Sequence, residues 1–389
     1  MQKKFLGLAI AAAFAAPVTA MADAALYGTF DVGLRQKSAL GANSSANTTG
    51  TSGTSTSSMD MRGLYASNAW GFKNSEDLGD GMKANLVFEA DFIPGATDAA
   101  GNWTYNAANT TQGQLFDRQL TGEIAGSFGT ATVGYQYTTA FKSNRTYDPM
   151  GYAFVTSLYS SAAVTSARGY SAEYSNKFGD ISVAAQYIMN NQDTASNSPA
   201  STGQGRSVGV DYAAGPISVG GSYTTVDSDV RTGTNKENPT TNVTAGAGFN
   251  FGDGTAKIGY AKKTTGAGSL AAGQLTNDAT STTMWVGANY NVSSKIGAAL
   301  AYYKNTANAG NAGGGTAAAV DVVKTKLMGM VTYAMSKKTT AYLGAETESA
   351  DVASTTTNSV GTTGAIAGTT LAADKAVTSS WSVGVAFKF

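Results

Sequence analysis

The sequence predicts an all-β fold, a transmembrane antiparallel β-barrel of sixteen strands formed by one chain of 389 residues. Three observations favour this fold. Segments of about ten residues alternate between apolar and polar side chains, which is the period of a strand with two different faces. The connections between these segments alternate between short turns and long polar loops, as in barrels that cross a membrane. The last segment, residues 381–389, has an unbroken apolar face and ends on Phe389.

The N-terminus is expected to be a cleaved signal peptide, residues 1–22, and not part of the fold. Two lysines precede an apolar run over residues 5–16, and the Ala-Met-Ala sequence at residues 20–22 fits a cleavage site. The run is too short for a helix that spans a bilayer. The mature domain, residues 23–389, loses the two lysines and has a net charge of −2. This balance gives no field that would attract nucleic acid.

The composition excludes several classes of enzyme. The chain has no cysteine and no histidine. Without histidine there is no Ser-His-Asp chemistry and no His-ligated zinc, so we expect no enzyme, no cofactor and no metal. Charged residues make up 13% of the chain, about half the usual share. An exported chain without disulfides must be held together by its core, by an assembly or by a membrane.

The first mature segment, residues 26–34, shows the two faces of a barrel strand. Leu26, Phe30 and Leu34 alternate with polar or small residues. Residues 82–92, 181–187, 217–223, 296–302 and 327–333 repeat the pattern. A soluble sandwich has the same period, so alternation alone leaves both folds open. In a barrel, the charged residues of the polar faces would point toward water in the lumen: Asp31, Arg35, Lys83 and Glu89.

The connections favour the barrel over the sandwich. Short Gly- and Asp-rich turns occupy residues 78–81, 127–130, 178–180 and 251–254. Long polar loops occupy about 38–58, 95–113, 139–168, 190–204, 227–239, 265–280, 306–321 and 350–376. Eight long loops that alternate with short turns predict sixteen strands, with the turns in the periplasm and the loops outside the cell. The faces and ends of the strands within 114–138 and 205–226 stay open.

Several motifs in chain order resemble those of general porins of Gram-negative, particularly betaproteobacterial, outer membranes. Residues 26–33 read L-Y-G-x-x-D-x-G, residues 70–84 read W-G-F-K-N-S-E-D-L-G-D-G-M-K-A, residues 115–119 read L-F-x-R-Q, residues 128–137 read F-G-T-x-T-x-G-x-Q-Y, residues 148–151 read D-P-x-G, and residues 383–389 read V-G-x-x-x-K-F. The resemblance covers the whole mature chain.

The resemblance implies a homotrimeric channel for passive diffusion of small hydrophilic solutes and ions across the outer membrane. It implies contacts with outer-membrane lipid and lipopolysaccharide, and a closing strand ending at Phe389 that the barrel-insertion machinery reads. It also implies that the third loop, about 139–168, folds into the pore. A sixteen-stranded barrel leaves an aqueous lumen in which charged side chains set ion preference. Two alternatives remain open: a solute-specific channel, and a surface-displayed barrel for adhesion or structure without transport.

The same resemblance supplies pore-lining candidates. Arg118 matches the family's basic ladder on the barrel wall, and Arg168 matches the residue after the third loop. Within the loop, Lys142, Arg145 and Asp148 are candidates for the constriction. Each has a simpler alternative: an ion pair at a strand end or trimer contact for Arg118, solvated loop charges for the two cations, and turn formation for Asp148, which precedes a proline.

The chain departs from the family pattern at three positions. Ala69, Tyr135 and Ala386 stand where related porins usually have arginine, and the third loop has little acidic charge. The usual field between an acidic loop and a basic wall should therefore be weak. We expect a weak ion preference, and we do not transfer the family's typical anion preference to this chain.

Overall fold

The computed structural model describes residues 24–40, 55–60, 65–91, 116–151, 168–189, 204–227, 239–266, 278–308, 321–352, 355–360, 366–371 and 374–389. The predicted signal peptide and much of the predicted long loops lie outside these residues. The strands are β1 (Ala25–Leu40), β2 (Ser55–Asp60), β3 (Ala69–Gly79), β4 (Met82–Asp91), β5 (Gln119–Gly126), β6 (Gly129–Tyr137), β7 (Arg168–Phe178), β8 (Ile181–Ile188), β9 (Gly205–Ala214), β10 (Ile217–Val226), β11 (Thr240–Phe251), β12 (Gly254–Thr265), β13 (Ala279–Asn291), β14 (Ile296–Asn308), β15 (Asp321–Ala334), β16 (Thr339–Val352), β17 (Thr355–Val360), β18 (Ile366–Leu371) and β19 (Asp374–Lys388). One helix, α2 (Thr139–Tyr147), follows β6.

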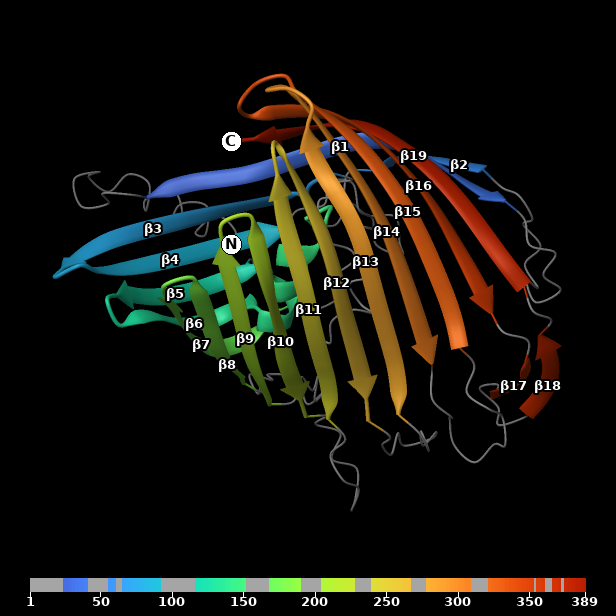
Figure 1. Ribbon diagram of the computed structural model, residues 1–389, viewed down its shortest axis with the longest axis horizontal. Helices are drawn as coiled ribbons and strands as arrows, with labels where there is room; N and C mark the ends of the chain where they lie inside the picture. The colour runs from blue at the N-terminus through green and yellow to red at the C-terminus, as the bar shows by residue number, and fades with distance from the viewer. Residues whose placement is uncertain are drawn as a thin grey trace, which may run out of the picture.

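The strands form a closed antiparallel barrel (Figure 1). From β3 to β16 each strand pairs with the next strand in the sequence, β16 pairs with β19, and β1 closes the sheet by pairing with β19, with Phe30 opposite Phe387. Both β2 and β3 pair with β1, at different heights, so they are two pieces of one barrel strand. The barrel therefore has the sixteen strands that the sequence predicts. β17 and β18 form a separate hairpin between β16 and β19.

The two faces of the barrel differ in chemistry as the alternation predicts. On β1, Leu26 and Leu34 are each 52% exposed, whereas Asp31 is fully buried on the opposite face. On β19, Trp381 and Phe387 are exposed on the outside and Ser382 is buried inside. An outward apolar band is what a membrane barrel presents to lipid. No helix among the described residues is long and apolar enough to cross a membrane.

Short turns and long connections alternate around the barrel. The turn between β3 and β4 has Gly79, Asp80 and Gly81 at φ values of 82°, 52° and 76°, in the left-handed region that glycine adopts most easily. The start of β1 lies at the same end of the barrel, because β1 runs antiparallel to β3 and Ala25 pairs with Lys73, which is the residue nearest this turn among those of β3 that pair with β1. We call this the turn end and the opposite end the loop end.

The helix α2 lies in the predicted third loop, where the sequence analysis did not predict an element; β2, β17 and β18, which overlap two other predicted loops, were not predicted either. The helix spans nine residues with the sequence T-A-F-K-S-N-R-T-Y, and the Thr138 hydroxyl caps it by accepting the Phe141 amide at 3.3 Å. A helix this short is marginal by itself in water. Its stability must come from its contacts with the inner faces of β8 to β12, against which it packs.

Candidate channel interior

Glycines on the barrel wall create the seat for α2. A Cβ atom on Gly246 of β11 would lie 2.3 Å from Cγ of Tyr147, and one on Gly209 of β9 would lie 2.6 Å from Cγ2 of Thr139. Real Cβ contacts are not this short, so only glycine permits the approach. The helix therefore lies directly on the backbone of the sheet, inside the barrel.

Polar contacts fix the first turns of α2 to the wall. The Thr139 amide donates to Oε1 of Gln186 at 3.1 Å, and the Gln186 amide group donates to the Tyr137 carbonyl at 3.1 Å. One turn later, the Thr244 hydroxyl donates to the Ser143 hydroxyl at 3.0 Å. These groups are buried, so their hydrogen bonds are needed to offset the loss of water.

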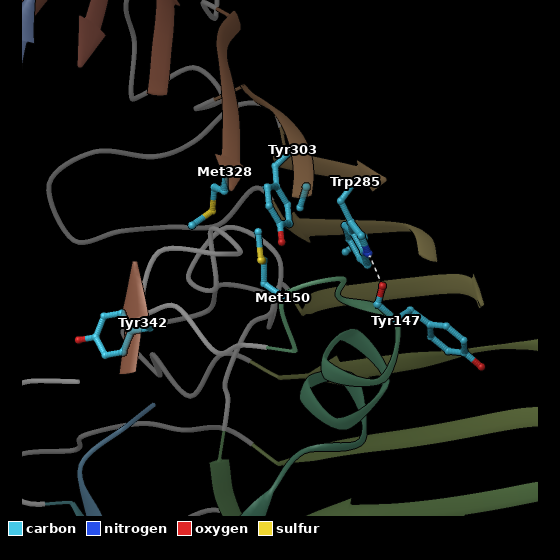
Figure 2. Packing of buried hydrophobic residues seen from close by; sticks show 8 residues of the cluster. Tyr147, Met150, Trp285, Tyr303, Met328 and Tyr342 are labelled. Carbon is cyan, nitrogen blue, oxygen red and sulfur yellow. Dashed lines mark hydrogen bonds between the residues drawn. The ribbon is translucent and has the colours of Figure 1, made fainter. Parts of the chain in front are cut away.

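The last residue of α2 is held from two sides. The Tyr147 hydroxyl donates to Oδ1 of Asp211 at 2.8 Å, and the Trp285 indole nitrogen donates to the Tyr147 carbonyl at 2.8 Å (Figure 2). Burial, and then the hydrogen bond to Asp211, raise the pKa of the Tyr147 hydroxyl above its ordinary value. Tyr147 therefore remains a donor at physiological pH.

Asp148 continues this anchor immediately after the helix. Its carboxylate is fully buried and accepts the Tyr303 hydroxyl at 2.6 Å and the Met150 amide at 3.2 Å. Lys257 of β12 donates to the Asp148 carbonyl at 3.2 Å. The contact with Met150 is the turn chemistry that the sequence left open. The carboxylate lies against the wall, behind the surface that faces the pore.

A cluster of apolar residues fills the inner side of the barrel beside this anchor. Tyr147 and Met150 belong to one cluster with alanine, aromatic and methionine side chains from the wall strands β12 to β16 (Figure 2). The buried members are Tyr147, Met150, Ala261, Trp285, Ala301, Tyr303, Met328 and Tyr342. The sequence analysis missed this cluster. Trp285 and Tyr303 face each other across β13 and β14 on the inner face, where alternation predicts polar residues.

The opposite side of α2 is exposed and basic. Lys142 and Arg145 lie three residues apart on the exposed face of the helix. Lys142 Nζ contacts both carboxylate oxygens of Glu173, at 2.7 and 2.8 Å. Arg145 makes no ion pair within the described part of the chain. The charge of Lys142 is thus compensated, whereas Arg145 leaves a positive charge on the exposed face of α2.

A second charged cluster lies near the start of α2. Arg118 donates to the carboxylates of Glu89 and Asp91, and to the Tyr137 hydroxyl at 2.7 Å. The Arg168 guanidinium donates to the same hydroxyl at 3.1 Å and lies 4.8 Å from the centre of the Tyr137 ring. The structure therefore brings together Arg118, Arg168 and Glu89, and adds Tyr137, which the sequence analysis did not select.

The comparisons with known proteins agree with this architecture. A family profile described as Gram-negative porin matches residues 7–353. The chain belongs to the Gram-negative porin family. An outer membrane porin of Bordetella pertussis is 30% identical over 157 residues, which are 40% of this chain and only 38% of that protein.

Solved structures show the same fold. An anion-selective porin from Comamonas acidovorans superposes with a TM-score of 0.66 at 18% identity, over 94% of this chain and 99% of that one. The trimer form of OmpT of Vibrio cholerae gives 0.55 at 13% identity, over 94% and 99%. The family and its relatives place this porin in the outer membrane of a Gram-negative bacterium.

Asp31 lies on the inner face of this porin, as the alternation predicts, but it does not face water. Its fully buried carboxylate accepts the amides of Tyr65 and Ala66 at 2.6 and 2.7 Å and the Tyr342 hydroxyl at 2.8 Å. Ala386, where related porins usually have arginine, is its partner across β1 and β19. These three donors are neutral, and the two amides fix the segment before β3 against the wall.

The remaining predicted charges line two other parts of the wall. Arg35 of β1 forms an ion pair with Glu346 of β16, and Lys326 of β15 lies 3.0 Å from Glu348. The sequence analysis selected only Arg35 from this group. Lys83 is exposed near the turn end of β4, away from α2. Among the described residues, no group of His, Cys, Asp and Glu is placed to hold a metal ion.

Proposed function

We propose that this porin is a general diffusion channel for small hydrophilic solutes and ions. The observation that carries the proposal is the closed barrel with an apolar outside and a polar inner face, across which the anchored helix α2 lies. A barrel of sixteen strands is wide enough to leave an aqueous lumen. A helix fixed to one side of that lumen narrows it without closing it, which limits the size of the solutes that pass.

Planar-bilayer recording tests this function directly. Folded protein added to a bilayer in KCl should produce stepwise increases in current that persist at low voltage. Protein unfolded by heating in the same detergent is the control and should produce none. Silent bilayers with correctly folded protein would refute the channel and favour a surface-displayed barrel for adhesion or structure.

The proposal includes a homotrimer, which the fold of the trimeric Vibrio cholerae relative supports. Current steps should then occur in groups of three, and the unboiled protein should migrate in gels at about three times the mass of the boiled chain. It also includes removal of residues 1–22 and recognition of the Phe389 strand by the insertion machinery. N-terminal sequencing of the purified protein checks the first of these. Migration of the unboiled protein as a monomer would refute the trimer.

We also propose a weak ion preference. Several of the described charges on the inner face are paired: Lys142 with Glu173, Arg35 with Glu346, and Arg118 with Glu89 and Asp91. Paired charges partly cancel each other's field at the distance of a passing ion. The zero-current potential in a tenfold KCl gradient should therefore lie near zero. A potential close to the limit for a purely cation- or anion-selective pore would contradict this proposal.

A further inference from the structure

A polar cavity lies beside the predicted pore, between α2 and the turn end of the barrel. Its volume is about 480 Å³. Thr139, Lys142, Ser143 and Thr146, which lie on one side of α2, form its roof, and the inner faces of β6 to β9 form its wall. Binding sites for small molecules commonly have volumes of about 300–1,000 Å³. The cavity is therefore large enough for a small solute and contains no aromatic side chain.

The strand register places two opposite charges in the wall of this cavity. Lys177 of β7 pairs with Ser182 of β8, and Ser182 pairs with Asp211 of β9. The three residues share one row on the inner face. Adjacent strands are about 4.8 Å apart, so the backbone positions of Lys177 and Asp211 are roughly 10 Å apart, with only a serine between them.

The next row toward α2 consists of residues with small side chains, which leave space between α2 and the charged groups of Lys177 and Asp211. Ser175, Ala184 and Gly209 lie side by side on the same three strands. Gly209 is already in close approach to Thr139 of the roof. Larger side chains in this row would fill the cavity. The small row therefore gives a solute access to both charges at once.

Both charged groups have capacity for a ligand. Lys177 is exposed and makes no ion pair with any described residue. The Asp211 carboxylate accepts the Tyr147 hydroxyl at Oδ1, and no hydrogen bond to its other oxygen is seen among the described residues. The second cation and carboxylate in the cavity, Lys142 and Glu173, are already paired with each other.

We propose that this cavity binds small zwitterions, solutes that carry an ammonium and a carboxylate group, such as α-amino acids with small side chains. The carboxylate would meet Lys177, the ammonium group would meet Asp211, and hydroxyls such as those of Ser182 and Ser175 would bind the rest. A simple anion would be repelled by Asp211 and a simple cation by Lys177. This proposal rests on the proposed channel function, to which it adds a site where one class of solute pauses.

Uptake of radiolabelled L-alanine into proteoliposomes tests the proposal. The initial rate should contain a saturable component that unlabelled glycine competes for, and that acetate and ethylammonium do not. The saturable component should weaken about tenfold in Lys177→Gln and in Asp211→Asn, because each removes one charge-assisted contact. Asp211→Asn keeps an oxygen for the Tyr147 hydroxyl, so the anchor of α2 is preserved. Lys83→Gln, which removes an exposed lysine of β4 outside the cavity, is the matched control and should behave as the wild type.

Lys177→Arg, which keeps the positive charge and does not touch the anchor of α2, separates recognition of a zwitterion from a structural effect. It should retain the saturable uptake that Lys177→Gln loses, and an equal loss in both variants would count against charge recognition. Linear uptake in the wild type, or equal competition by acetate, would overturn the proposal. KCl conductance of the same preparations separates the two ideas: conducting channels with linear alanine uptake refute only the cavity, whereas non-conducting protein refutes the channel.

Discussion

The close approach of Tyr147 to Gly246 makes the position of α2 sensitive to a single methyl group. In Gly246→Ala the new Cβ would lie 2.3 Å from Cγ and 2.4 Å from Cβ of Tyr147. Ordinary van der Waals contact requires at least 3.4 Å, so the end of the helix must move away from the wall by about 1 Å. Overpacking of this kind typically costs about 1–3 kcal/mol. A cost of about 1–2 kcal/mol lowers the ratio of docked to undocked loop by roughly 5- to 30-fold.

Single-channel recording measures the consequence. Because the helix moves toward the pore axis, the conductance of Gly246→Ala should fall, and excursions of the undocked loop should increase the open-channel noise. Gly248→Ala is the matched control on the same face of β11. Its Cβ would meet only the hydroxyl of Ser218, which can rotate away. Equal conductance and noise in the two variants would refute the reasoning that Gly246 sets the seat of α2.

Three further outcomes are expected. Asp148→Asn should shift the cation-to-anion permeability ratio toward anions, because it removes a negative charge that interacts with the nearby Lys257, whose ammonium group also contacts the Asp148 carbonyl. Tyr303→Phe keeps the charge and should not change the zero-current potential. Arg145→Gln should shift the same ratio toward cations, because Arg145 is exposed on α2 and unpaired among the described residues; an unchanged potential would place it outside the ion path. Leu300 is 59% exposed on the outer face, so Leu300→Arg should lower the free energy of unfolding in lipid by up to about 2–4 kcal/mol. Urea titration in liposomes measures this free energy. An unchanged unfolding midpoint would show that this face does not contact hydrocarbon.

The strands were predictable from the sequence because each barrel strand obeys a local rule. Alternation of side chains follows from the pleat, and it is visible wherever one face meets lipid. The tight turn at residues 79–81 is likewise fixed by the dihedral preference of glycine. The pairing of the last strand, β19, with the first strand, β1, could also be predicted, because a barrel must close. The break between β2 and β3 was not predicted, because it depends on the segment before β3 being drawn onto Asp31.

The interior was harder to predict because its contacts join residues far apart in the sequence. Nothing near Thr139 shows that Gly209 and Gly246 will receive a helix. Nothing near Asp148 shows that its carboxylate will be buried against Tyr303, which is 155 positions away. The inner face of a barrel also tolerates apolar residues where a loop covers it, so Trp285 broke the alternation without any local signal.

The candidate charges show why residue type alone does not give ion preference. Arg118 directly precedes β5, and Arg145 lies in the third loop. Arg118 is held by two carboxylates and the Tyr137 hydroxyl, so its charge is largely compensated where it lies. Arg145 projects from the exposed side of α2 and has no described partner. The field in the pore therefore depends on which face of α2 packs against the wall. Gly209 and Gly246, which permit the close approach of Thr139 and Tyr147, determine that face. If this is correct, a variant that undocks the helix, Gly246→Ala, should change ion preference as well as conductance, although it changes no charge.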